Sequence, residues 1–406
     1  MADGNNDLSV TLQEVGRYLE DHVTAEVAPV SQVPMVLGNR NERMAKVDYK
    51  LLSALLSGKT SQMQMFSPIE TRGMEDDVLA GVDTTTRDLY RLFKKALKEK
   101  VFLEPVNACA ETYFNQLIQE PKFERLHSTM KRNYAAALQD DAQQTLNKVM
   151  KSDLKEILSS GATEINKYKL YIRHLEKAST LLGQKHYMYP ILQGRQEHFK
   201  GYLMVSESHN DVKLGIKALE QLRSSLIWQP DQPLVYLDMS SVFGIVLGEP
   251  DSAKYYDLLA ASLAPTWLLP YTHLSNILCR YKGRLDEAKI LLDKALTIDS
   301  NAAVVWYFLG IWHAFNSRTD YLAAENCFNK SILLDPTVQS TYYYLACVLN
   351  EQNKIDAAYN QLELAINKGY KQYDKFQQDM RLENMRQNSE RWKTLMKKHF
   401  PDKIKE

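Results

Sequence analysis

The sequence predicts an all-α protein whose larger part is an array of antiparallel helix pairs. One observation is a spacing of 35, 35, 36 and 34 residues between small residues, at Ala218, Ala253, Ala288, Ala324 and Ala358. A second small residue follows each of these after seven residues, at Ser225, Ala260, Ala295, Ser331 and Ala365. A proline or another helix-ending position follows each after twelve, at Pro230, Pro265, Ser300, Pro336 and Tyr370. Amphipathic helices alone do not place small residues at a fixed spacing of this length. The regular spacing of the small residues therefore indicates repeats.

Two successive copies between Asn301 and Gly369 show the repeating unit most clearly. In each copy a first helix carries an aromatic, an apolar and a small residue, at Trp306–Leu309–Gly310 and then at Tyr342–Leu345–Ala346. This helix–turn–helix pattern resembles the tetratricopeptide repeat, whose period is about 34 residues. The resemblance covers residues 161–369, with degenerate first repeats. It implies a right-handed superhelix of antiparallel helix pairs. It also implies an interaction scaffold that binds a protein or peptide in a concave groove lined by the first helices.

The groove-facing positions that the resemblance implies are aromatic and nearly uncharged. They place the peptide-binding groove at Asn276, Tyr307, Phe308, Ile311, Tyr343, Tyr344 and Asn350. Tyrosine suits recognition because it offers a large rigid contact area and one hydrogen bond. These positions carry no Lys or Arg, which argues against the carboxylate clamp that some members of the family use. An alternative stays open, in which some of the rings face the neighbouring repeat as core.

The first fifty residues resemble a different family. The order ADGNND, VTLQEVGRYLEDHV and SQVPMVLGN is similar to the C-terminal tail of a bacterial caspase-like (C14) cysteine peptidase domain, with an acidic loop, a helix over 12–23 and a strand over 33–37. Catalysis in that family needs a Cys nucleophile and a His base on glycine-containing loops. No His or Cys of the chain precedes a glycine. The resemblance implies a non-catalytic remnant of a protease; the alternative is a cysteine peptidase whose catalytic residues lie upstream of Met1.

The acidic opening also has the spacing of a calcium loop. Asp3, Asn5, Asp7 and Glu14 occupy ligand positions of an EF-hand, together with Ser9 and Thr11. The glycine that such a loop needs for its sharp turn is replaced by Leu8. A competing interpretation is a capping box from Thr11 to Glu14 that opens the following helix. We therefore expect no functional metal site here.

Three further segments complete the expected domain organisation. Residues 51–86 lack sustained periodicity and are expected to be a linker. Residues 87–160 have helical periodicity and predict helices near 107–118, 123–138 and 142–158, ended by Gly161. Residues 370–406 mix apolar residues with many charges, which suits capping helices with a polar outer face.

Composition bounds the partners and the compartment. The 406 residues carry 50 basic and 50 acidic side chains, so no net charge favours a nucleic acid or an anionic membrane as partner. No apolar run approaches the roughly 18 residues of a membrane span. Four cysteines lack metal-ligand spacing and predict buried thiols in a reducing, cytoplasmic compartment: Cys109, Cys279, Cys327 and Cys347. His273 and His313 are expected to be structural, no cofactor is expected, and the oligomeric state stays open.

Overall fold

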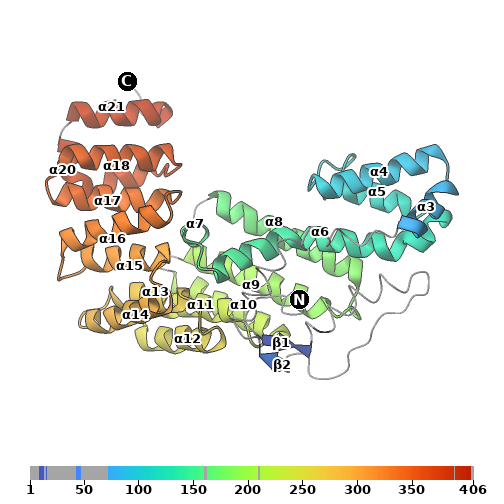
Figure 1. The fold of residues 1–406 in the computed structure, drawn as a ribbon, viewed down its shortest axis with the longest axis horizontal. Coiled ribbons are helices and arrows are strands. Elements are labelled where there is room, and N and C mark those ends of the chain that lie inside the picture. Colours follow the sequence, from blue (N-terminus) through green and yellow to red (C-terminus); the bar gives the residue numbers. More distant parts are fainter. Residues whose placement is uncertain are drawn as a thin grey trace. The chain divides into compact units, whose positions relative to one another are not determined.

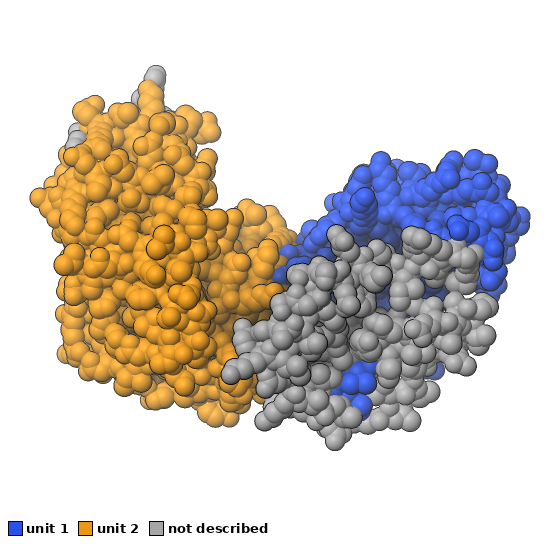
Figure 2. All heavy atoms as spheres, viewed as in Figure 1, with its two compact units in different colours: residues 1–144, 168–199, 224–231 blue, residues 145–167, 200–223, 232–406 orange. Residues whose placement is uncertain are grey.

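The computed structural model describes residues 9–12, 15, 43–46, 72–159, 162–208, 211–387 and 389–403. The chain divides into two compact units (Figure 2). Unit 1 comprises residues 1–144, 168–199 and 224–231, and unit 2 comprises residues 145–167, 200–223 and 232–406. Their segments alternate along the chain, so the units do not follow the boundary that the sequence suggested at residue 160.

Two short strands are described near the N-terminus. Strand β1 (Ser9–Thr11) pairs antiparallel with β2 (Arg43–Lys46), with Ser9 opposite Lys46 (Figure 1). Leu12 and Val15 are helical. The rest of the expected helix over 12–23, the expected strand over 33–37 and the calcium-loop candidates Asp3, Asn5, Asp7 and Glu14 lie outside the described residues. The caspase-like resemblance therefore stays a prediction.

Unit 1 contains a helix within the expected linker. Helix α3 (Arg72–Ala80) lies in the segment 51–86, and its Val78 is buried. Helix α4 (Thr84–Lys98) then starts at Asp83, whose carboxylate accepts the backbone N–H of Thr86 at 2.9 Å. Helix α5 (Ala110–Leu117) follows. The segment expected to be a linker thus includes a helix, which is too short to give sustained periodicity in the sequence.

Helix α6 (Glu124–Met150) is continuous where two helices, over 123–138 and 142–158, were predicted. The residues between them include neither glycine nor proline, so nothing interrupts the hydrogen-bond ladder. The 3-10 turn η2 (Pro121–Phe123) precedes α6, and the short helix α7 (Leu154–Ile157) follows it. Helices α6, α8 (Ala162–Leu182), α9 (Tyr189–Ser208) and α10 (Val212–Trp228) each contribute residues to both units.

Aromatic side chains fill the core of unit 1. The rings of Phe93, Phe102 and Phe114 lie around Tyr134, with centroid separations of 5.9, 6.4 and 5.7 Å. The buried hydroxyl of Tyr134 donates to the carbonyl oxygen of Phe102 at 2.9 Å. The hydroxyl in the middle of this aromatic cluster is therefore satisfied.

The repeats of unit 2 are antiparallel helix pairs (Figure 1). Helix α11 (Pro233–Ser241) packs against α12 (Pro250–Leu263), and α13 (Leu269–Leu278) packs against α14 (Leu285–Ile298). Helix α15 (Ala303–Ala314) packs against α16 (Tyr321–Leu334), and α17 (Gln339–Glu351) against α18 (Ile355–Asn367). A π-helical turn, η3 (Val242–Val246), extends α11. The predicted all-α array of paired helices is confirmed.

The small residues that define the repeat period are completely buried in the second helices. Both sets have 0% exposure: Ala218, Ala253, Ala288, Ala324, Ala358, and Ser225, Ala260, Ala295, Ser331, Ala365. Helices α10, α12, α14 and α16 each end two residues before the predicted breaker positions, Pro230, Pro265, Ser300 and Pro336. The regular spacing of small residues in the sequence therefore marks the positions at which helices pack closely.

A broken helical segment follows the last pair. It comprises α19 (Tyr373–Gln378), η4 (Met380–Leu382), α20 (Glu383–Gln387), α21 (Ser389–His399) and η5 (Pro401–Lys403). Leu382, Met385 and Met396 are buried in the core of the last repeats, whereas Lys393 is exposed. Across the described part of the chain, every helix is too short or too polar to cross a bilayer.

Candidate functional site

Equivalent positions of the first helices differ in exposure. Helices α11, α13, α15 and α17 contact one another in succession and form one face of unit 2. One row on this face is buried in every repeat, with exposures of 7, 0, 4 and 0%: Leu237, Thr272, Tyr307 and Tyr343. In the row four residues further along, Ser241, Asn276 and Ile311 are half-buried, whereas Cys347 on α17 is buried. We call the three half-buried residues of this second row the open row.

The seven predicted peptide-binding residues divide accordingly. Asn276, Ile311 and Tyr344 are half-buried. Four are buried, which corrects the predicted groove: Tyr307, Phe308, Tyr343 and Asn350. The alternative interpretation, in which rings serve as core, therefore holds for three of the aromatic residues. A signal for this was present in the sequence, because Leu237 and Thr272 occupy the same repeat position as Tyr307 and Tyr343.

The segment around α7 covers one part of the first-helix face. Leu154 is 2% exposed and belongs to the same apolar cluster as Val304, Tyr307 and Phe308. Nearby, the indole N–H of Trp267 donates to the carbonyl oxygen of Val149 at 3.0 Å. The α7 segment is thus part of the apolar core that includes these residues of α15.

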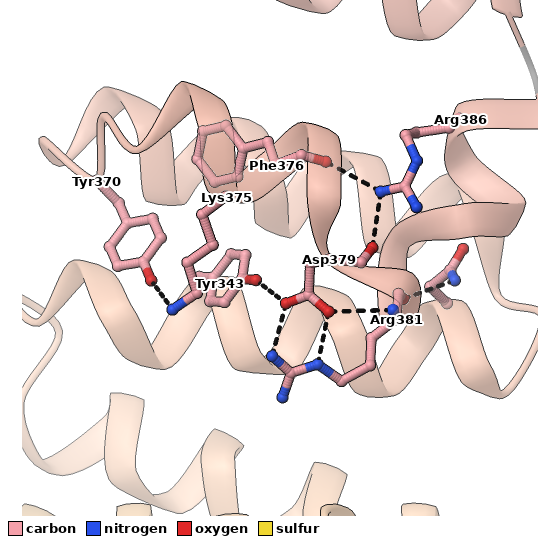
Figure 3. Close-up of polar contacts among 8 residues, drawn as sticks. Tyr343, Tyr370, Lys375, Phe376, Asp379, Arg381 and Arg386 are labelled. Carbon is pink, nitrogen blue, oxygen red and sulfur yellow. Dashed lines mark hydrogen bonds and ion pairs between the residues drawn. The ribbon is translucent and has the colours of Figure 1, made fainter. Parts of the chain in front are cut away.

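The segment around α19 and η4 covers a second part, at α17 (Figure 3). The hydroxyl of Tyr343 donates to the carboxylate of Asp379, and the Nε and Nη2 atoms of Arg381 donate to the same carboxylate at 2.7 and 2.6 Å. Although burial opposes ionisation, these hydrogen bonds lower the pKa of Asp379 below its ordinary value. Asn350 donates to the carbonyl oxygen of Arg381 at 2.8 Å. The predicted groove residues Tyr343 and Asn350 thus hold this segment in place.

The same segment places two cations against the aromatic residues. The ammonium of Lys375 lies 4.8, 5.4 and 5.5 Å from the ring centres of Tyr343, Tyr344 and Tyr370. The guanidinium of Arg381 lies 5.6 Å from the ring centre of Tyr344 and 4.5 Å from that of Phe315. The expectation of a nearly uncharged groove is therefore wrong at α17, because the charges come from outside the repeats.

A polar cluster joins α11, α12 and α13. The carboxylate of Asp257 is fully buried; it accepts the Ser240 hydroxyl at 2.7 Å and faces Nδ1 of His273 at 3.0 Å. The other ring nitrogen of His273 lies 2.9 Å from the hydroxyl of Ser241. His273 is thus a structural histidine with partners on both nitrogens, as the sequence predicted.

The Ser241–His273–Asp257 distances are those of a nucleophile, a base and an orienting carboxylate. The surrounding charges favour the protonated ring of His273. Burial opposes the charged ring, but the charge and hydrogen bonding of Asp257, with Asp238 nearby, raise the pKa of His273 above its ordinary value. This cluster is suited to holding three helices together.

Three of the four thiols lie in environments that oppose their ionisation. Cys109, Cys327 and Cys347 are buried, and Cys279 is half-buried. Burial raises the pKa of Cys279 and of Cys327 to about 11 and that of Cys347 to about 12. A reactive cysteine needs a lowered thiol pKa, so these three residues have the opposite environment.

One family model and several solved structures match parts of the chain. A tetratricopeptide repeat family model matches residues 270–301, which contain α14 and most of α13. The chain is similar to the solved structure of MamA from Desulfovibrio magneticus RS-1, with 14% identity, a TM-score of 0.31 and coverage of 43% of this chain and 97% of that one. It is also similar to the "APC/C hetero-tetramer Cut9-Hcn1", with 16% identity, a TM-score of 0.36 and coverage of 74% and 58%.

A further similar structure is YrrB, whose title describes "a TPR protein with an unusual peptide-binding site". Its identity is 16%, its TM-score is 0.29, and the match covers 55% of this chain and 92% of that one. No curated protein sequence matches the chain.

Proposed function

We propose that this protein is an interaction scaffold that binds a peptide or protein partner along the open row of its first helices. The observation that carries the proposal is the repeat-equivalent pair Asn276 and Ile311, which stay half-buried on contacting helices α13 and α15 while the neighbouring row is core. Stacked helix pairs expose such a face to extended ligands. Tyr344 on α17 continues the same face beside Phe315, which is also half-buried.

Selection of peptides from a displayed library on the folded full chain, followed by calorimetric titration, tests the proposal. Substituting both Asn276→Ala and Ile311→Ala should weaken binding at least tenfold, because removing two central contacts typically costs about 1–2 kcal/mol or more. The matched control is Tyr255→Ala with Ile290→Ala on the second helices α12 and α14, where the side chains are 63% and 68% exposed. This control should bind as the native chain does. Weakened binding by the control variant together with unchanged binding by the Asn276/Ile311 variant would place the site on the second helices.

We further propose that the scaffold belongs to a bacterial, cytoplasmic caspase-like peptidase and selects its substrates or regulators. The residue order of positions 1–50 supports this finer proposal. The raised thiol pKa values favour it over a chain that is itself the peptidase. Cleavage of a fluorogenic peptide by the purified chain, abolished by replacing one cysteine, would contradict it.

A further inference from the structure

Lys375 has an unusual environment for a lysine of this protein. Its side chain is half-buried, and its one described hydrogen bond runs to the hydroxyl of Tyr370 at 2.8 Å. It forms no ion pair with a described carboxylate. By contrast, Lys354 pairs with Glu325 at 2.7 Å and Lys398 with Glu363 at 2.6 Å. An ammonium has three donors, so Lys375 keeps donors in a partly desolvated place.

The local charges do not balance. Lys375 and Arg381 both lie within 6 Å of the ring centre of Tyr344, and Asp379 is the carboxylate paired with Arg381. Two positive charges thus face one negative charge. Burial, followed by the charge of Arg381, lowers the pKa of Lys375 below its ordinary value. The tyrosine rings offset part of this cost through cation–π attraction.

Arg381 also has a donor that is not used by the described residues. The Nη1 atom of Arg381 makes no hydrogen bond to a described residue, and 32% of its side chain is exposed. Phe315 and Tyr344 beside it are half-buried and offer apolar ring surface. A single negative charge would balance the site, whereas a phosphate dianion would leave a new unpaired charge in a partly buried place.

We propose that Lys375 and Arg381 bind one carboxylate of the peptide partner, with its adjoining apolar group on Phe315 and Tyr344. This inference rests on the proposed function and names the chemistry of its ligand. The cations are supplied by the segment after the last repeat. The carboxylate belongs to an Asp or Glu side chain or to a C-terminus, and the experiment distinguishes these two sources.

Three probe peptides are titrated into the full chain. The first alternates Leu and Glu and has blocked ends. The second replaces Glu by Gln, and the third is the Gln peptide with a free C-terminus. If a side-chain carboxylate is recognised, the first should bind at least about tenfold more tightly than the second, since a charge-assisted hydrogen bond contributes that much. If a terminal carboxylate is recognised, the third should show this gain.

The variant Lys375→Gln should remove the gain, and Lys371→Gln is the matched control because Lys371 is an exposed neighbour in the same segment. Equal losses in both variants would indicate general attraction and overturn the inference. Equal affinity for all three probes, or no binding up to about 1 mM, would also overturn it. Unchanged melting of Lys375→Gln verifies that it folds. Selected peptides that depend on Asn276 and Ile311 but not on Lys375 would refute this inference while the proposed function stands.

Discussion

His273 shows how one buried residue links neighbouring repeats. Its ring connects Ser241 of α11 with Asp257 of α12, and the residue itself belongs to α13. Asp238 and Arg280 are the other charged groups that act on it. Burial raises the pKa of Asp257 above its ordinary value, despite the opposing effect of His273. Both groups therefore bind protons more tightly in the folded chain than in the unfolded one.

This linkage predicts a pH-dependent stability. A histidine whose pKa is raised in the folded state contributes its full stabilisation of the fold at pH values below its unfolded pKa of about 6.5. This contribution is lost as pH rises through the folded pKa. His273→Gln should lower the free energy of unfolding by about 3 kcal/mol near pH 6 and by less near pH 9, as chemical denaturation would measure. His313→Gln is the control, because burial lowers the pKa of His313 and its contribution falls with acid. Equal slopes for both variants would contradict this account.

At the scale of elements, each helix pair has a contact between a small residue on the first helix and a larger one on the second. Gly310 faces Phe328, and a Cβ atom at Gly310 would lie 2.6 Å from the ring. The equivalent positions in the next repeat are Ala346 and Leu362, both fully buried. In an earlier repeat the same position pair is Ser240 and Asp257. The polar cluster of His273 therefore replaces an apolar contact of the repeat.

This match in residue size predicts that the effect of Gly310→Ala on stability changes sign with the size of residue 328. Gly310→Ala in the native chain should destabilise by about 1–2 kcal/mol, because overpacking against the ring outweighs the gain in helix propensity. In the Phe328→Leu background, which imitates Ala346 and Leu362, the same substitution should be neutral or stabilise by up to about 1 kcal/mol. Thermal or denaturant unfolding of the four proteins measures the coupling. Additive effects would show that the two residues do not share this contact.

The sequence predicted the helix pairs well and the face of the first helices poorly, for a physical reason. Close packing within a pair leaves small residues such as Ala324 at a fixed spacing, and that spacing is visible in the chain. Burial of Tyr343 depends on a neighbour outside the pairs, the segment around Asp379, and Leu154 from a distant segment joins the apolar cluster of Tyr307. Periodicity carries no information about which distant segment covers an aromatic position. The charges at α17 were missed for the same reason.

At the scale of the whole molecule, other segments of the chain cover parts of the first helices of unit 2. The segment around α19 and η4 covers α17, and residues of segment 145–158 pack against the apolar clusters of the first helices, whereas the open row stays half-buried. Repeat arrays are stabilised by contacts between neighbours, so a ligand on this face should protect several first helices together.

Hydrogen exchange of the full chain, with and without a saturating selected peptide, tests this central claim most directly. The account predicts that amides of α13, α15 and α17 exchange at least about fivefold more slowly in the complex, and that α12, α14 and α16 change little. Protection confined to these second helices, or to α4, α5 and α6 of unit 1, would contradict it.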